Sequence, residues 1–441
     1  MNSRTIPTRG RLLRSSVGLA LGLAAVVPTL ACTASDDAAP PTVPPSSGPA
    51  PAPASTVTDT TVTDTTVTET TVAGTTMPPV TAVGEALIAS FAPRLDRALA
   101  EEFAASPELR GHLVLLRSDD GFVWSGAAGD AAVDASFRIA SVTKMFTSAA
   151  VLRLVEEGRV GLLEPLSSAL TPETADVLAS AGHDVAAITV AQLLTHTSGL
   201  PDFTFGPGSD FLGQVLADPQ RRWTRAEQVG LAMQLPPVGP PGAQYHYSDT
   251  GYALLGEIVE RATGTTLGAA MRELLHFDEL GMVHTYQESI DPVPPGQPGR
   301  LHQWFGDLDT YDWDPSLDLY GGGGLVSTAA DLATFVEALL GGELFEQAGT
   351  LETMLSVPPT NSQVSVPGNP SSLAAAAGIF RTDIAGHRCW GHEGFWGVQV
   401  LRCPEARLTV VVSRSQASPP PTYSGAQIGG VVLELLAALE A

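Results

Sequence analysis

The order of strand-like and helix-like segments is the feature that most constrains the fold of this chain. Segments of strand length lie in two groups, one before residue 130 and one after residue 385, and helical apolar spacing occupies the region between them. Both ends of the folded region can therefore enter one antiparallel sheet that the intervening helices cover. The expected strands are 112–117, 122–127, 388–394, 398–403 and 408–413. The expected helices are 85–105, 141–157, 190–195, 224–233, 250–263, 331–340 and a last one from Ile428.

The first 31 residues have the pattern of an export signal. Several arginines precede an apolar run over residues 17–27, which is too short to span a membrane. Cys32 follows the sequence 29–31, which resembles a bacterial lipobox except that Thr29 stands where leucine is usual. We expect an exported protein that is either a lipoprotein of the cell membrane, lipidated at Cys32, or extracellular. The alternative is an ordinary cleaved signal with an incidental cysteine.

The rest of the chain divides into a linker and a folded domain. Residues 32–80 are rich in proline, alanine, serine and threonine and contain too few apolar residues to form a core, so we expect a disordered linker. Such a spacer suits a protein tethered to a surface. Residues 81–441 show no internal repeat and are expected to form one domain.

Composition limits the partners and cofactors. A net charge of −24 argues against nucleic acid and anionic lipid surfaces, because like charges repel at long range. A small molecule or a cell-wall peptide fits better, with the membrane reached only through the N-terminal anchor. The three cysteines lack the paired spacing of a zinc site, and the sequence has neither HExxH nor GxGxxG. We expect no metal and no organic cofactor.

Lys144 is the only lysine, and the other 22 of the 23 basic residues are arginine. An ammonium can lose its proton in an apolar site, which a guanidinium cannot, so a solitary lysine indicates a position that needs this chemistry. Ser141 precedes it by three residues on a predicted helix, a spacing at which side chains meet. In such a pair the lysine amine can activate the serine hydroxyl as a nucleophile. The plainer alternatives are survival of Lys144 by drift and a helix N-cap at Ser141.

Two further segments could complete a catalytic site. Tyr247 and Asp249 lie in an aromatic loop before a predicted helix, where a phenol can pass a proton between nucleophile and leaving group. His392, Glu393 and Gly394 lie on a predicted strand whose small residues let a substrate backbone approach its edge. The alternatives are aromatic packing with an Asp249 N-cap, and a surface strand with a solvated histidine.

The segment 388–403 has the pattern of a hairpin whose turn centres on Trp396. Cys389 and Cys403 are equally distant from Trp396, so antiparallel pairing places them opposite each other, with Cα atoms about 4.5–5.5 Å apart. That distance is within disulfide reach, and exported proteins keep such bonds. We predict a disulfide between these two cysteines.

Taken together, the motifs resemble the serine penicillin-recognising hydrolases over essentially all of residues 85–440. The matching segments are 137–144, 189–200, 247–249, 321–328 and 391–394. The most similar branch contains class C β-lactamases, D-alanyl-D-alanine carboxypeptidases and related esterases. The resemblance implies an antiparallel five-stranded sheet flanked by helices plus an all-helical subdomain, the β-lactamase/penicillin-binding-protein fold.

The resemblance also implies roles for individual residues. Ser141 would be the acylated nucleophile, and Lys144 and Tyr247 would share the general-base and general-acid work. The backbone N–H groups of Ser141 and Phe395 would form the oxyanion hole. His196 would order its loop, and the glycines 321–324 would lie at the cleft, although a flexible turn also explains them. The expected substrate-binding residues are Asp249, His392, Glu393, Gly394 and Phe395.

Two positions depart from the pattern of the relatives, many of which have Asn in place of Asp249 and Thr or Ser in place of Glu393. An ionised Asp249 can only accept hydrogen bonds, and an ionised Glu393 would repel a substrate carboxylate. Glu393 could point away, pair with Arg388 or another arginine, or be protonated. Otherwise the substrate lacks a carboxylate, as for an esterase, or carries an amine, as for an amidase or aminopeptidase.

We therefore expect an exported acyl-serine hydrolase. A carboxypeptidase-like activity on cell-wall D-Ala peptides is the leading hypothesis, because export and the linker place the protein beside that substrate. An esterase comes next and a class C-like β-lactamase third. The alternative of another class is a non-catalytic penicillin-binding or cell-wall-binding module, for which a deprotonatable amine at Lys144 would have no use.

Overall fold

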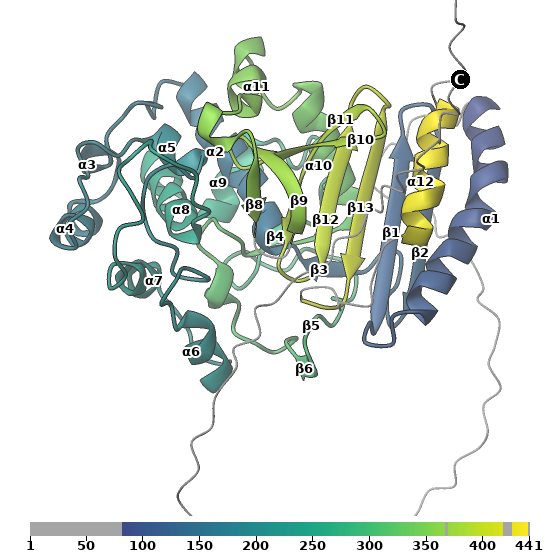
Figure 1. Ribbon diagram of the computed structural model, residues 1–441, viewed down its shortest axis with the longest axis horizontal. Helices are drawn as coiled ribbons and strands as arrows, with labels where there is room; N and C mark the ends of the chain where they lie inside the picture. Colours follow the sequence, from purple (N-terminus) through teal and green to yellow (C-terminus); the bar gives the residue numbers. More distant parts are fainter. Residues whose placement is uncertain (1–81, 367–368, 418–425, 440–441) are drawn as a thin grey trace, which may run out of the picture.

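The computed structural model describes residues 82–366, 369–417 and 426–439. Its centre is an eight-stranded sheet in the order β2-β1-β13-β12-β11-β10-β9-β8, in which every neighbouring pair is antiparallel (Figure 1). The strands are β1 (Gly111–Ser118), β2 (Val123–Gly129), β8 (Val364–Val366), β9 (Asn369–Ala375), β10 (Phe380–Ile384), β11 (His387–Gly394), β12 (Val398–Cys403) and β13 (Leu408–Arg414).

The expected five strands are all present, and β1 from the N-terminal group pairs with β13 from the C-terminal group. The antiparallel sheet closed by both ends of the chain is therefore confirmed. The count of five strands is wrong, because β8, β9 and β10 extend the sheet beyond β11. Their sequences contain Pro, Ser, Arg, Thr and Asp instead of a clean apolar alternation, so periodicity gave no signal there.

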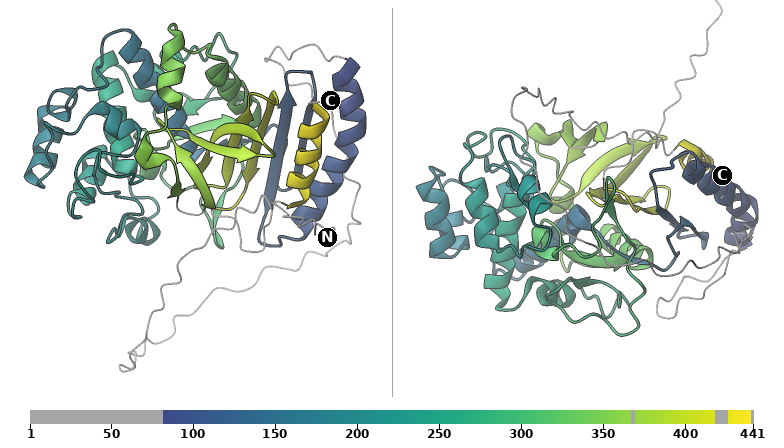
Figure 2. Two further views of the ribbon diagram at one scale, coloured as in Figure 1. Left: turned by 45° about the horizontal axis from the view of Figure 1, so that its top comes forward. Right: turned by 90° about the horizontal axis from the view of Figure 1, so that it is seen from below.

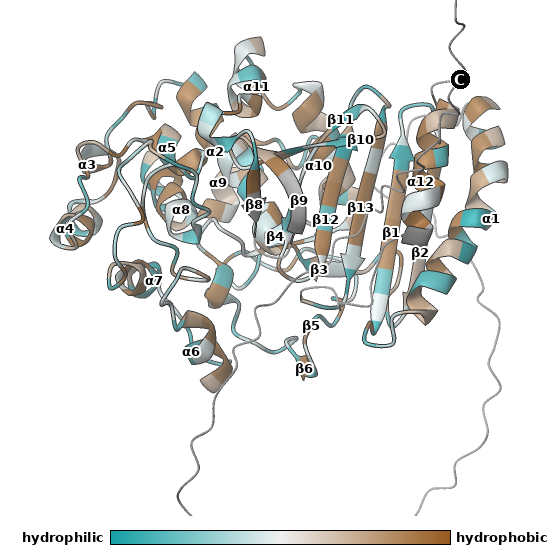
Figure 3. Cartoon of the chain, in the orientation of Figure 1, coloured by the Kyte–Doolittle hydropathy of each residue, from teal (hydrophilic) through white to brown (hydrophobic). Residues whose placement is uncertain are grey.

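Helices cover both faces of the sheet. On one face, α1 (Ala82–Ala104) and α12 (Ala426–Leu439) lie side by side, as Figures 1 and 2 show, and pack with the outer strands. The other face carries α2 (Thr143–Glu156) and α10 (Ala329–Gly341). Alternate residues of β1 enter the two cores: Val114 and Leu116 face α1, whereas Leu113 and Leu115 face the larger core. Figure 3 shows the apolar residues that run along β1, β12 and β13.

A helical region lies beside the sheet and contains α3 to α9 (Figure 1), which agrees with the expected all-helical subdomain. These helices are α3 (Leu166–Ala169), α4 (Pro172–Ser180), α5 (Val190–Leu194), α6 (Phe211–Ala217), α7 (Arg225–Ala232), α8 (Asp249–Thr263) and α9 (Leu267–Leu274); α11 (Ala348–Leu355) follows later. The short turns of 3-10 helix are η1 (Ala140–Val142), η2 (Pro315–Asp318) and η3 (Pro359–Asn361). The short strands are β3 (Ser136–Arg138), β4 (Tyr286–Gln287), β5 (Trp304–Phe305), β6 (Leu308–Asp309) and β7 (Leu325–Thr328).

The C-terminal hairpin has the predicted register. Trp390 pairs with Arg402 and Gly394 with Val398, so the turn centres on Trp396. Cys389 and Cys403 form a disulfide, with their Cα atoms 4.1 Å apart, slightly less than expected. The predicted bond is confirmed.

The predicted signal peptide (1–31), the lipidation site at Cys32 and the linker (32–80) lie outside the described residues. Within the residues that are described, no helix combines the length and the apolar character needed to cross a membrane.

Candidate active site

Ser141 lies on η1, the short 3-10 turn between β3 and α2, not on the helix itself. The helix predicted from residue 141 is therefore split, and α2 begins at Thr143. Ala140, directly before Ser141, has φ 46°, the left-handed region that side chains other than glycine rarely adopt. The N-cap residue of α2 is Val142, so the interpretation of Ser141 as an N-cap is wrong. This turn presents the Ser141 hydroxyl at the start of a buried helix.

Lys144 is fully buried and all its polar contacts are acceptors. Its Nζ lies 2.9 Å from Ser141 Oγ, 2.7 Å from the carbonyl oxygen of Gly322 and 2.5 Å from Asp249 Oδ1. Thr147 Oγ1 also donates to the carbonyl oxygen of Gly321, at 2.7 Å. The glycine run is thus a packed wall of the site, and its interpretation as a flexible turn is wrong.

Tyr247 lies on the other side of the nucleophile. Its hydroxyl donates to Ser141 Oγ at 2.9 Å. Burial, followed by the charge of Asp249, raises the pKa of Tyr247 well above its usual value of 10, so the phenol keeps its proton. Ser141 Oγ therefore lies within hydrogen-bond distance of both an amine and a phenol, the geometry of an activated nucleophile.

His196 holds the loop that carries Tyr247. Its ring stacks on the Tyr247 ring with centroids 4.5 Å apart, and its Nδ1 accepts the backbone N–H of Ser248 at 3.1 Å. Burial lowers the pKa of His196 well below 6.5, so the ring is neutral. This is the positioning arrangement that the sequence predicted for His196.

Asp249 is the first residue of α8, but the cap of that helix is Ser248, whose hydroxyl accepts the N–H of Gly251 at 3.3 Å. The N-cap alternative for Asp249 is therefore wrong. The carboxylate points to Lys144 instead, and its ion pair with the ammonium is nearly inaccessible to water, since the two side chains are 10% and 0% exposed.

Sequence reasoning missed two further carboxyl groups. Asp202 is 2% exposed, and its carboxylate accepts the N–H groups of Asp249, Thr204 and Phe205 at 3.0, 3.2 and 2.9 Å. Asp318 lies at the end of η2. Burial, followed by the charge of Asp249, raises the pKa of both Asp202 and Asp318 to about 7. Neither residue lies in a periodic segment, so only their position in the fold reveals them.

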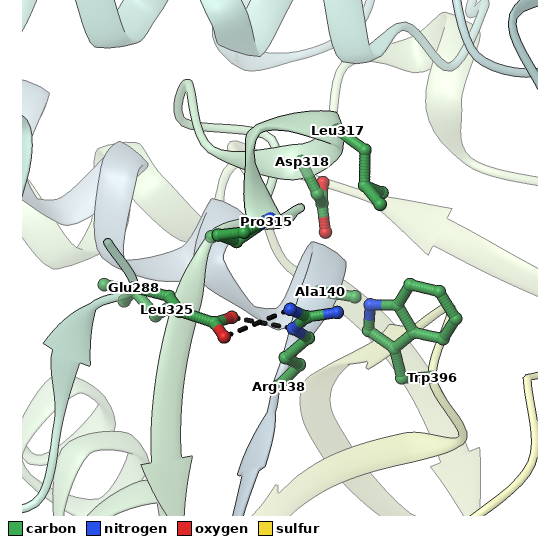
Figure 4. Close-up of a pocket in the computed structure, with 9 residues that line it drawn as sticks. Arg138, Ala140, Glu288, Pro315, Leu317, Asp318, Leu325 and Trp396 are labelled. Atoms are coloured by element: carbon green, nitrogen blue, oxygen red, sulfur yellow. Dashed lines mark hydrogen bonds and ion pairs between the residues drawn. The ribbon is translucent and has the colours of Figure 1, made fainter. Parts of the chain in front are cut away.

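A cavity adjoins the nucleophile turn and is lined by Ala140, Asp318 and Trp396, among others. Figure 4 shows the Asp318 carboxylate and the Trp396 ring at this cavity, with Arg138 paired to Glu288. Arg138 donates Nε and Nη2 to the two oxygens of Glu288, at 2.7 and 3.1 Å, and Nη1 to a backbone carbonyl. The guanidinium is therefore fully used inside the protein.

The strand β11 brings His392, Glu393 and Gly394 to the site. β10 pairs with β11 only as far as Gly391, so the last three residues of β11 extend beyond that pairing. Neighbouring strand residues point to opposite faces. His392 is 4% exposed, whereas Glu393 is half-buried and accepts a hydrogen bond from Gln399 Nε2 at 3.2 Å. The Glu393 side chain therefore lies on the face of β11 opposite to His392.

Gly394 lies against the backbone just before the nucleophile, because a Cβ at this position would overlap the carbonyl oxygen of Ile139. The next residue, Phe395, is thereby held beside η1. Its ring packs against Phe205 and Trp396, with centroids 5.6 and 4.9 Å away. An aromatic rim thus borders the turn that carries Ser141.

Several known proteins are similar to this chain. Esterase EstB of Burkholderia gladioli is 35% identical over 193 residues, which are 42% of this chain and 48% of that protein. The D-alanyl-D-alanine-carboxypeptidase/endopeptidase AmpH of Escherichia coli (strain K12) is 27% identical over 248 residues, 55% of this chain and 60% of that protein. The chain spans about half the length of the curated relatives it matches.

Among solved structures, the D-amino acid amidase from Ochrobactrum anthropi SV3, complexed with L-phenylalanine amide, has a TM-score of 0.64 at 23% identity, covering 80% of this chain and 99% of that chain. A D-stereospecific amidohydrolase from Streptomyces sp. has a TM-score of 0.63 at 24% identity, covering 76% and 98%. These likenesses show the fold. The family described as Beta-lactamase matches residues 97–428. The chain therefore belongs to the beta-lactamase family of serine hydrolases.

Proposed function

We propose that the protein hydrolyses amides or esters through an acyl-enzyme on Ser141. The observation that carries this proposal is the position of Ser141 Oγ, 2.9 Å from both Lys144 Nζ and the Tyr247 hydroxyl. In the first step Lys144 acts as an uncharged amine, after its ammonium has lost one proton: Ser141 Oγ attacks the substrate carbonyl while the Ser141 proton passes to Lys144 Nζ. The high pKa of Tyr247 makes its phenol a proton donor to the leaving group. Water then attacks the acyl-enzyme and releases the acid.

The negative charge that develops on the carbonyl oxygen needs donors that are already in place. We assign this role to the backbone N–H groups of Ser141 and Phe395. Supporting this assignment, the close approach of Gly394 to Ile139 holds the Phe395 turn beside η1.

The leading substrate class is cell-wall D-Ala peptides, cleaved by an exported and lipid-anchored protein. The similarity to AmpH, whose name states carboxypeptidase and endopeptidase activity, supports this choice. An esterase is the second candidate, supported by the 35% identity to Esterase EstB. Lactam hydrolysis remains the third.

Intact-mass spectrometry after addition of benzylpenicillin or, separately, a short-chain aryl ester tests the proposal. Wild type and Ser141→Ala are compared over time. A persistent penicilloyl adduct on wild type alone would support a carboxypeptidase-like enzyme, and an adduct that forms and clears would indicate a β-lactamase. Ester turnover without an adduct would favour the esterase. Ester turnover by Ser141→Ala would refute the acyl-serine mechanism, and absence of any reaction would favour the non-catalytic module.

A further inference from the structure

The ring of His392 has a defined tautomer. Its Nδ1 lies 2.6 Å from the carbonyl oxygen of Glu393. A carbonyl oxygen only accepts hydrogen bonds, so Nδ1 carries the ring proton and Nε2 carries a lone pair. His392 therefore presents an acceptor, not a donor, at Nε2.

That acceptor is buried and has no hydrogen-bond partner among the residues that the structure describes. Burial, followed by the charge of Lys144, lowers the pKa of His392 to about 3, so the ring is neutral at any ordinary pH. His392 lies near the nucleophile, because Gly394, two residues further along β11, lies directly against the carbonyl oxygen of Ile139, two residues before Ser141. A buried acceptor without a partner destabilises the empty site, and a ligand that brings an N–H donor removes this cost.

The cations near Ser141 are already occupied. Lys144 Nζ is surrounded by Ser141 Oγ, the Gly322 carbonyl and the Asp249 carboxylate, all within 2.9 Å. The guanidinium of Arg138 is used by Glu288 and backbone carbonyls. Neither can take a substrate carboxylate without losing an existing ion pair.

Asp202 and Asp318 are both influenced by the charge of Asp249, which itself pairs with Lys144. A cationic ligand would favour the charged carboxylates of Asp202 and Asp318, whereas an anionic ligand would make their ionisation still more costly.

We infer that the acyl part of the substrate carries an amine and no carboxylate, and that His392 recognises this amine by accepting a hydrogen bond at Nε2. The inference rests on the proposed hydrolase function and specifies the substrate class within that function. It favours acyl groups that bear an amine, as in amino-acid amides and esters, over acyl groups that bear a carboxylate, and it applies to the acyl part only, not to a carboxylate on the leaving group.

Three phenyl esters with one leaving group test the inference. D-alanine phenyl ester carries an amine, propionic acid phenyl ester lacks it, and succinic acid monophenyl ester carries a carboxylate. For wild type we expect kcat/KM to be about tenfold or more higher for the amine-bearing ester than for the carboxylate-bearing ester. A hydrogen bond to a charged group typically contributes a free energy of this size. His392→Lys replaces the acceptor by a cationic donor and should reduce or reverse this ratio. His302→Lys adds the same charge at a half-exposed position and should leave the ratio unchanged.

Equal or better use of the succinyl ester by wild type would overturn the inference, as would an unchanged ratio in His392→Lys. If His392→Lys does not fold, His392→Gln, whose amide can donate or accept, should lower the ratio by a smaller factor. Saturation-transfer NMR can measure the binding of D-alaninamide and of succinamate to Ser141→Ala. It compares the affinities for an amine and for a carboxylate without turnover. Preferential binding of D-alaninamide together with inactivity of wild type toward all three esters would reject the proposed function and retain the recognition site.

Discussion

Replacing Asp318 by Asn should stabilise the protein at high pH and leave it almost unchanged at low pH. Asp318 has a pKa of about 7 in the folded protein and 3.8 as its ordinary value, because burial and the Asp249 charge disfavour the carboxylate. The folded state therefore binds the proton more tightly than the unfolded state. The free energy of unfolding then falls as pH rises from about 4 to about 7, and the loss is complete above that range.

The size of the effect follows from the shift. About three pKa units correspond to about 4 kcal/mol at full burial. Because the side chain reaches the cavity beside Ala140, solvent reduces this penalty, and we expect about 1–3 kcal/mol. An asparagine has nearly the same shape and no charge, so the variant has no free-energy cost of ionising a buried carboxyl group at any pH.

Urea unfolding of wild type and Asp318→Asn at pH 4, 6 and 8, with the disulfide kept oxidised, measures the difference. The variant should match wild type at pH 4 and exceed it by about 1–3 kcal/mol at pH 8. Asp312→Asn, an exposed carboxylate of the same loop, serves as the matched control and should show no such trend. A difference that stays constant or shrinks with rising pH would refute the reasoning.

Three further predictions concern the nucleophile, the strand and the hairpin. Lys144→Arg keeps the charge but cannot accept the Ser141 proton, so kcat/KM for an aryl ester should fall by about 10²- to 10⁴-fold; retained activity would exclude the base role. Glu393→Thr removes a negative charge on the strand face opposite to His392, so the rate of acylation by benzylpenicillin should stay unchanged, and a faster rate would mean that Glu393 reaches the substrate. Cys389→Ser with Cys403→Ser should lower the free energy of unfolding by about 3 kcal/mol, because the bond closes a segment of 14 residues. A change below 1 kcal/mol in urea unfolding would contradict this.

The parts of the fold that could be predicted are those encoded locally. The β11–β12 hairpin has one turn at Trp396 and alternating apolar residues, which together determine its register and hence the Cys389–Cys403 pairing. The Ser141–Lys144 contact depends on two residues three positions apart. Interactions of this kind need no knowledge of how distant segments pack.

The parts that could not be predicted depend on distant contacts. Asp202 and Asp318 lie in loops, and each becomes a buried carboxyl group only because the fold brings it to Asp249. The left-handed backbone at Ala140 has no sequence signal either, since glycine is the residue that usually marks it. Strand β10 contains Arg, Thr and Asp, and it joins the sheet through backbone pairing with β11.

The packing around Lys144 also explains why the single lysine stands where it does. Its Nζ is enclosed by Ser141 Oγ, the Gly322 carbonyl and Asp249 Oδ1, and a Cβ at Gly322 would lie only 3.5 Å from Nζ. A planar guanidinium needs more room and directs five N–H donors into a fork, whereas an ammonium directs three toward acceptors arranged around one point. The enclosure therefore selects an amine by its shape, and the chemistry of Ser141 requires that this amine can take up a proton. The other 22 basic residues of the chain are arginine, whose guanidinium keeps its charge and offers donors in a fixed geometry.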